Sequence, residues 1–181
     1  MKSNAVLSAK PQPDEYAPYY GRYISLITGD DIVVTLEEQL PETVALLSVR
    51  KETEGDFRYA PGKWSVKEAL GHVIDTERIF SYRALRIARN DKTPIEGFEQ
   101  DDYVKCGPFG QSRLAALVEE FRSVREATLS LLRGLDQTAW TRRGVASENE
   151  VSVRAIAYII AGHELHHRKL FQERYFSAAV S

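Results

Sequence analysis

The sequence predicts an all-α fold, a four-helix bundle, and three observations support this fold class. Four stretches place apolar residues at the spacing of an amphipathic helix. No segment shows the strong alternation of apolar and polar residues that is typical of a strand. The chain has 181 residues, which suits one domain with a sizeable core. Four amphipathic helices bury their apolar faces by packing around one core.

The first two helices are predicted from their capping residues and apolar positions. The first begins after Asp30 or Asp31, either of which is a good N-cap. The second opens with a capping box between Ser65 and Glu68 and runs to about Arg89. The apolar residues are Ile32, Leu36, Leu40, Val44 and Leu47 in the first helix, and Val66, Ala69, Val73, Phe80, Ala84 and Ile87 in the second.

The last two helices are predicted near Ser112 to Gly134 and near Ser152 to Phe176. Residues 90–111, between the second and third helices, form a long connection rich in proline and glycine. Antiparallel neighbours need only a short turn, so this connection is expected to cross the whole bundle. Helices two and three would then run parallel, which gives an up-down-down-up topology with a long helix 2–3 crossover loop.

Residues 1–30 are expected to form an irregular N-terminal leader that packs on the bundle, and residues 31–181 a single bundle domain. Pro11, Pro13 and Pro18 disfavour a helix in the leader. The leader also lacks the apolar segment of a signal peptide. No stretch reaches the roughly 18 consecutive apolar residues that a membrane-spanning helix needs. We therefore expect a cytoplasmic protein.

Charge and cysteine content exclude several classes of partner and site. The formal net charge is -2, which gives no electrostatic footprint for nucleic acid or for an anionic membrane. Neither is expected as a partner. The single cysteine, Cys106, allows no intramolecular disulfide and no thiolate zinc cluster within the chain.

Three of the four histidines are predicted to share a divalent transition metal. His163 and His167 are one helical turn apart, in the middle of the apolar face of the fourth helix. Burying two imidazoles there costs free energy unless their nitrogens have partners, which a metal ion supplies. His72, at the edge of the apolar stripe of the second helix, lies at a matching depth if those helices are antiparallel. His166 points to the side and is expected outside the ligand set.

Residues 163–167 also match the H-E-x-x-H pattern of zinc proteases, with Glu164 in the place of the general base. The best-known enzymes of that class take a third ligand from a later element. Here 14 residues follow His167, and their single candidate ligand, Glu173, lies on the same helix. The sequence also lacks a recognisable substrate-aligning strand. The protease interpretation is therefore rejected, although Glu164 remains a candidate base for another metal-assisted hydrolysis.

Several short segments form a pattern that is similar to a known family. They are Lys63-Trp64-Ser65, Gly71-His72, Asp75 to Arg78, Tyr82 to Arg86, Gly97-Phe98, Asp101-Asp102-Tyr103 and Ala161 to His167. On these segments the chain resembles the DinB-like superfamily of DinB/YfiT-like metalloenzymes over roughly residues 20–177. The resemblance implies an up-down-down-up bundle, nickel or zinc held by His72, His163 and His167, and often a homodimer. Some relatives are transferases or isomerases that use a low-molecular-weight thiol.

Three hypotheses for function stay open, because three protein ligands leave positions for water or substrate. In the leading one, the metal binds a low-molecular-weight thiol cosubstrate for transferase-type chemistry on a small-molecule substrate, which Arg83 and Tyr103 orient. In the second, metal-activated water performs hydrolysis with help from Glu164 or Asp75. In the third, the protein holds or senses metal without catalysis. Cys106 as a nucleophile is a further alternative.

Overall fold

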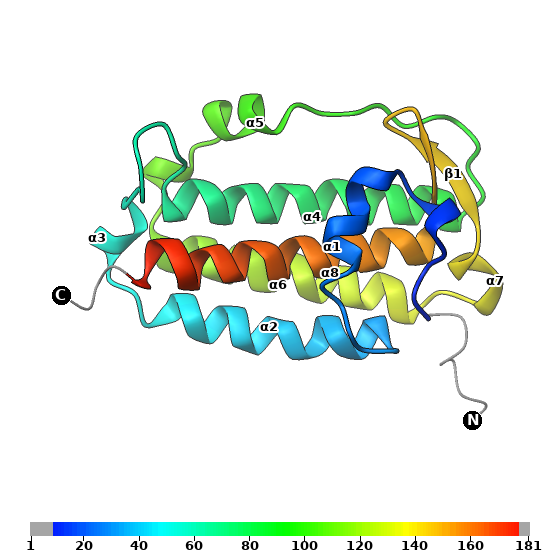
Figure 1. Cartoon of the computed structure of the whole chain (residues 1–181), viewed down its shortest axis with the longest axis horizontal. Helices are drawn as coiled ribbons and strands as arrows, with labels where there is room; N and C mark the ends of the chain where they lie inside the picture. Colours follow the sequence, from blue (N-terminus) through cyan, green and yellow to red (C-terminus); the bar gives the residue numbers. More distant parts are fainter. Residues whose placement is uncertain (1–8, 178–181) are drawn as a thin grey trace.

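A computed structural model describes residues 9–177 and shows four long helices packed as a bundle (Figure 1). The predicted helical bundle is therefore confirmed. The long helices are α2 (Ile32–Ser48), α4 (Val66–Ala88), α6 (Leu114–Arg133) and α8 (Val153–Leu170). A π-helical turn, Phe171–Tyr175, continues α8. Short helices are α3 (Glu52–Gly55) and α7 (Gln137–Trp140).

The long helices start where their capping residues predict. The Asp31 side chain accepts a hydrogen bond from the backbone N–H of Val33 at the start of α2. At the start of α4, Ser65 and Glu68 each accept a hydrogen bond from the other's backbone N–H, at 3.2 and 2.7 Å. The hydroxyl of Ser152 caps α8 in the same way. These local signals fix the starts of three helices.

Helices α4 and α8 pack against each other in antiparallel orientation. In Figure 1, α4 and α6 run one way, while α2 and α8 run the other way. Two hydrogen bonds support the shared direction of α2 and α8. The Gln39 amide donates to the carbonyl of Ala161, and about one turn further along both helices Thr43 donates to Glu164. An early residue of α4 therefore lies beside a late residue of α8.

The buried apolar side chains form two clusters along the bundle. One contains Phe80 and Leu132 with the first half of α8, and the other contains Leu70, Phe121 and Phe171. Within residues 9–177, no helix is both long and apolar enough to cross a membrane.

The connection from α4 to α6 passes over the outside of the bundle and carries α5 (Gln100–Cys106), which the sequence did not predict (Figure 1). A turn of 3-10 helix, Phe109–Gln111, follows it. Phe109 packs flat on Gly71 of α4, where an added Cβ would lie 2.3 Å from the ring. A side chain at position 71 would therefore push this connection away from α4.

A small hairpin adds two short strands that the sequence did not predict. Strand β1 (Arg143–Ala146) pairs antiparallel with β2 (Asn149–Ser152), directly before α8. Ser147 and Glu148 join the strands with positive φ at both residues, a turn that usually takes Asn-Gly. Four-residue strands and an atypical turn give little periodic signal, which explains why the sequence did not reveal the hairpin.

The leader is more ordered than expected within its described part, whereas residues 1–8 lie outside the described range. Pro13 and Pro18 each begin a turn of 3-10 helix, because proline is tolerated at the first helical position. The short helix α1 (Gly21–Ile24) follows and lies on α8. At the contact, an added Cβ at Gly162 would meet the carbonyl oxygen of Tyr23 at 2.2 Å.

Candidate metal centre

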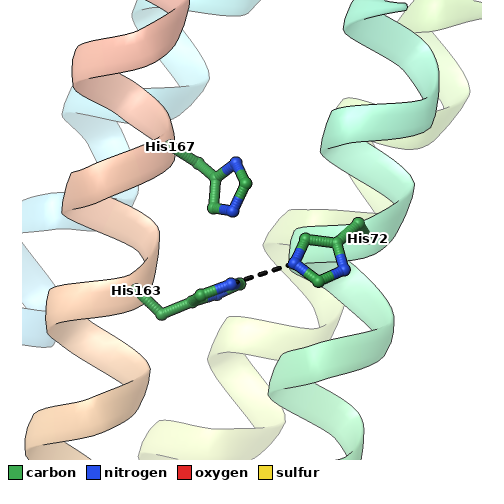
Figure 2. A group of neighbouring side chains, drawn as sticks. All are labelled: His72, His163 and His167. Atoms are coloured by element: carbon green, nitrogen blue, oxygen red, sulfur yellow. Dashed lines mark hydrogen bonds between the residues drawn. The ribbon is translucent and has the colours of Figure 1, made fainter. Parts of the chain in front are cut away.

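The structure brings His72 of α4 together with His163 and His167 of α8 (Figure 2). One nitrogen from each ring lies within 4.8 Å of the nitrogens of the other two. The Nε2 atoms of His72 and His163 are 3.0 Å apart. Their rings come from two antiparallel helices and point toward a common centre between them. This is the arrangement that three ligands of a single ion require.

Two glycines allow other segments to cover this centre. Gly71 directly precedes His72 and receives the ring of Phe109, while Gly162 directly precedes His163 and receives the backbone of Tyr23. A methyl group at either glycine would clash with the segment that packs there. The crossover therefore lies on α4, and the leader on α8, each beside a histidine of the cluster.

Burial keeps all three imidazoles neutral. His72, His163 and His167 are between 4 and 8% exposed. Burial lowers the pKa of His72 from 6.5 to about 4. The pKa values of His163 and His167 are held well below the usual value, first by burial and then by the neighbouring histidines. Neutral rings keep a lone pair free at neutral pH, as metal ligation requires.

Neighbouring side chains fix the orientation of the rings. The Thr76 hydroxyl lies 3.5 Å from Nδ1 of His72, on the side of the ring away from the shared centre. The Trp64 ring packs on His72, with 4.8 Å between ring centroids. Tyr23 packs edge-on against His163 at 5.3 Å. Such partners hold a ligand ring in place, so that little ordering remains to be done when a metal binds.

His166 lies beside the cluster rather than within it. It is half-buried and packs against both Tyr23 and His167. Burial lowers its pKa as well. Its ring stays outside the group of nitrogens that lie within 4.8 Å of one another.

Two cavities reach the histidines from outside. We call the first, of about 270 Å³, the tyrosine cavity. Its lining comprises Tyr19, Tyr20, Tyr23, His72, Thr76, Phe80, Phe98, Glu99, Gln100, Asp101, Ile159 and His163. We call the second, of about 340 Å³, the tryptophan cavity. Its lining comprises Tyr59, Gly62, Lys63, Trp64, Ala69, Asp101, His167, Leu170 and Tyr175. A larger hollow between residues 94–97 and 145–148 contains no histidine of the cluster in its lining.

Glu164 belongs to a different polar cluster, which we call the ion-pair cluster: Thr43, Glu77, Arg125 and Glu164. Its Oε1 accepts a hydrogen bond from Thr43 of α2, whereas its buried Oε2 has no partner among the described residues. Burial raises the pKa of this carboxyl group. Arg125 makes a two-pronged ion pair with Glu77 at 2.8 and 2.9 Å. Glu164 lines neither of the two cavities, although it directly follows His163 and lines with it a small void of about 10 Å³.

The other two candidate catalytic residues lie beside the tyrosine cavity but do not line it. Arg83 is buried and donates to the carbonyl of Glu96 at 3.0 Å and to the hydroxyl of Ser147 at 2.9 Å. It therefore joins α4 to the crossover and to the hairpin turn. Tyr103 is 46% exposed and packs on Phe98, at 5.2 Å between ring centroids.

The remaining two candidates lie away from the histidine cluster. Asp75 is half-buried on α4 and pairs with Arg78 at 3.4 Å, and burial raises its pKa. Cys106 is an exposed free thiol at the end of α5. Neither side chain lines the two cavities.

Several residues around the histidines were not singled out from the sequence as part of the site. They include Tyr23, which lies in the expected leader, and Thr76 and Asp101, which appeared only within the family pattern. The hydroxyl of Thr76 follows His72 by one turn, a spacing that could have revealed it. The position of Asp101 depends on the path of the crossover, for which the sequence carries no periodic signal.

The fold and the site define this protein as a helical bundle with a three-histidine centre suited to a metal ion. The chain belongs to the DinB superfamily, whose match covers residues 35–171. Among solved structures it is similar to YfiT from Bacillus subtilis, with a TM-score of 0.75 and 15% identity over 97% of this chain and 99% of that one. YfiT is described as a probable metal-dependent hydrolase with an unusual four-helix bundle topology. No curated protein sequence matches the chain.

Proposed function

We propose that the protein is a metal-dependent hydrolase of a small molecule, with a divalent transition metal held by His72, His163 and His167. The observation that carries this proposal is the convergence of three buried imidazole nitrogens within 4.8 Å, next to two open cavities. A structural zinc site normally uses four protein ligands, whereas three ligands beside a cavity are typical of a catalytic site.

The donor set fits a transition metal. Three neutral nitrogen ligands suit zinc, nickel, copper or iron, and we favour nickel or zinc. Because the pKa values of the three rings are already lowered by burial, protons do not compete for their lone pairs at neutral pH. When bound, such an ion supplies Lewis acidity and lowers the pKa of a coordinated water.

The tyrosine cavity is the proposed place for the substrate. Its walls include Phe80 and Phe98, which shield a bound molecule from bulk water, while Glu99 and Asp101 supply carboxylates. Thr76, which also lines this cavity, and Trp64, which lines the other one, contact the ring of His72. Arg83 helps to place Phe98 in the wall of this cavity, because it donates a hydrogen bond to the nearby carbonyl of Glu96. Its role in this proposal is to position the crossover.

Hydrolysis is favoured over thiol-dependent transfer, which the resemblance also implied. The description of YfiT as a probable hydrolase supports the choice of hydrolysis. No described residue around the histidines specifically favours a thiol cosubstrate. The two reactions differ in one requirement, since only transfer needs an added thiol.

A substrate panel tests the proposal. Protein purified without an affinity tag is loaded with zinc or nickel and assayed on esters, amides and phosphoesters, with and without added thiols. We expect hydrolysis that requires metal but no thiol, and that is lost in His163→Ala. Turnover only with a thiol would favour the transferase hypothesis. Stoichiometric metal without turnover of any substrate would contradict the hydrolase proposal and favour a metal-holding protein.

A further inference from the structure

Asp101, on the crossover helix α5, borders both cavities that reach the histidines. The tyrosine cavity touches His72 and His163, and the tryptophan cavity touches His167. Within residues 9–177, Asp101 is the one residue in the linings of both. A residue that lines both cavities lies between them, and Asp101 is exposed, so it is placed at the outer end of the two cavities.

The position of α5 is set by anchors on both of its sides, and both anchors are on α4. Before α5, the carbonyl of Glu96 accepts a hydrogen bond from Arg83 at 3.0 Å. After α5, the buried ring of Phe109 lies on Gly71, where even a methyl group would collide with it. His72 lies between these two anchor points along α4. The crossover is therefore held along the part of α4 that carries this ligand, and Figure 1 shows the crossover running beside α4.

The charge of a bound ion calls for an anion on this side. Three neutral imidazoles leave the charge of a divalent cation uncompensated in a largely buried site. Glu164, adjacent to a ligand in sequence, is held by Thr43 in the ion-pair cluster and does not line either cavity. Glu99 lines the tyrosine cavity only. Asp101 offers a carboxylate at the mouth of both.

We propose that Asp101 is a fourth functional residue of the metal centre, whose carboxylate would partly compensate the charge of a bound ion from the place where both cavities open. This inference rests on the proposed metal binding by the three histidines. It also gives α5 a role, because the anchored crossover then supplies an anion that the two ligand-bearing helices lack. The chain offers a matched control in Asp102, a neighbour on α5 that is exposed like Asp101 but lines neither cavity.

Metal affinity provides the first readout. Zinc and cobalt(II) affinities of the full chain, Asp101→Asn and Asp102→Asn are measured by competition with a chromophoric chelator. We expect Asp101→Asn to bind about 10- to 100-fold more weakly than the wild type, as is typical when a partner of the metal centre is lost. Asp102→Asn removes the same charge one residue away and should stay close to wild type. Asp101→Glu should recover part of the affinity.

Binding of thiocyanate to the cobalt-loaded protein, followed by visible absorption, separates an electrostatic role from a structural one. Without the negative charge of the Asp101 carboxylate, thiocyanate should bind about tenfold more tightly. Equal metal affinities of Asp101→Asn and Asp102→Asn would overturn the inference. So would a loss of affinity in Asp101→Asn without tighter thiocyanate binding. If the wild type itself binds no metal, the proposed function fails; if it binds metal and only these differences are missing, Asp101 alone is wrongly assigned.

Discussion

Two polar clusters are buried side by side in the bundle, and they differ in how their polar atoms are satisfied. In the ion-pair cluster, Arg125 is fully buried and gives two hydrogen bonds to Glu77 and one to the carbonyl of Leu36. In the histidine cluster, three neutral rings face one another and two cavities lead to them. Adjacent residues of α8, His163 and Glu164, belong to different clusters.

The difference separates a structural polar cluster from one that is prepared for a ligand. Arg125 and Glu77 satisfy each other's charge inside the protein, and the ion-pair cluster connects α2, α4, α6 and α8. The Oε2 of Glu164 is the one buried polar side-chain atom of this cluster without a partner among the described residues. In the histidine cluster, the Nε2 atoms of His72 and His163 are partners for each other at 3.0 Å, and a ligand that enters from the cavities can replace this contact. A variant that perturbs one cluster can therefore be compared with the other cluster as its reference.

Breaking the ion pair should have the largest effect on stability. Arg125→Met leaves Glu77, which is 3% exposed, as an unpaired buried charge. We expect a loss of about 3–5 kcal/mol in the free energy of unfolding, measured by urea denaturation. The double variant Arg125→Met with Glu77→Leu should recover much of this loss, because no charge remains unpaired. A single variant as stable as the wild type would show that the pair is not the element that holds this cluster.

The histidine cluster should make the metal-free protein sensitive to acid. The folded chain keeps His72 neutral down to about pH 4, whereas the unfolded chain takes up the proton near its ordinary pKa of 6.5. The unfolded state therefore binds more protons in this window, and stability falls as the pH decreases from 6.5 to 4. His72 alone contributes about 3 kcal/mol to this loss, and His163 and His167 act in the same direction.

Urea denaturation with a chelator present, repeated between pH 7 and 4, checks this prediction. His72→Ala should show a shallower decline than the wild type, since one of the three groups no longer titrates. A free energy of unfolding that does not change across this window would contradict it.

Gly71→Ala should disturb the cover of the histidine cluster and leave the ion-pair cluster intact. The new Cβ would lie 2.3–2.5 Å from three atoms of the Phe109 ring. We expect overpacking to cost about 1–3 kcal/mol, partly offset by about 1 kcal/mol from the better helix propensity of alanine. Gly110→Ala is the control, because its Cβ would meet nothing within 4 Å. Equal thermal unfolding temperatures for the two variants would show that the crossover is not pinned at Gly71.

Glu164→Gln should have the smallest effect on the metal centre. Its side chain bonds to Thr43 and lines neither cavity, so metal affinity should stay within about threefold of the wild type, well short of the effect of losing a partner of the metal centre. Hydrolysis should also persist. If metal stays bound while turnover is abolished, Glu164 is the general base after all, and the separation of the two clusters does not hold for catalysis.

Much of the bundle could be predicted from the sequence because its signals are local. Caps such as Asp31 and Ser65, and apolar residues at helical spacing, need no knowledge of the rest of the chain. The histidine pair on α8 was visible for the same reason. The helical spacing also indicated that Glu164 points away from the metal ligands, because a residue adjacent to His163 is rotated by about 100° around the helix.

What the sequence could not show depends on contacts between distant segments. The β1–β2 hairpin is short and turns through Ser147 and Glu148, which are not typical hairpin residues. The position of Asp101 follows from Arg83 and Gly71, which are many residues away in the chain. Neither the hairpin nor the path of the crossover gives a periodic pattern of apolar residues. Only the assembled structure therefore reveals that α5 lies by the histidines.

If three histidines from two antiparallel helices form one metal site, His72 and His163 are both needed for stoichiometric binding. The most direct test is elemental analysis of protein purified without an affinity tag, alongside His72→Ala, His163→Ala and His166→Ala. We predict about one transition-metal ion per chain in the wild type and in His166→Ala, and loss of stoichiometric metal in the other two variants. A wild type without stoichiometric metal would contradict a metal site formed by these histidines. Retention of the metal in His72→Ala or His163→Ala would contradict it as well.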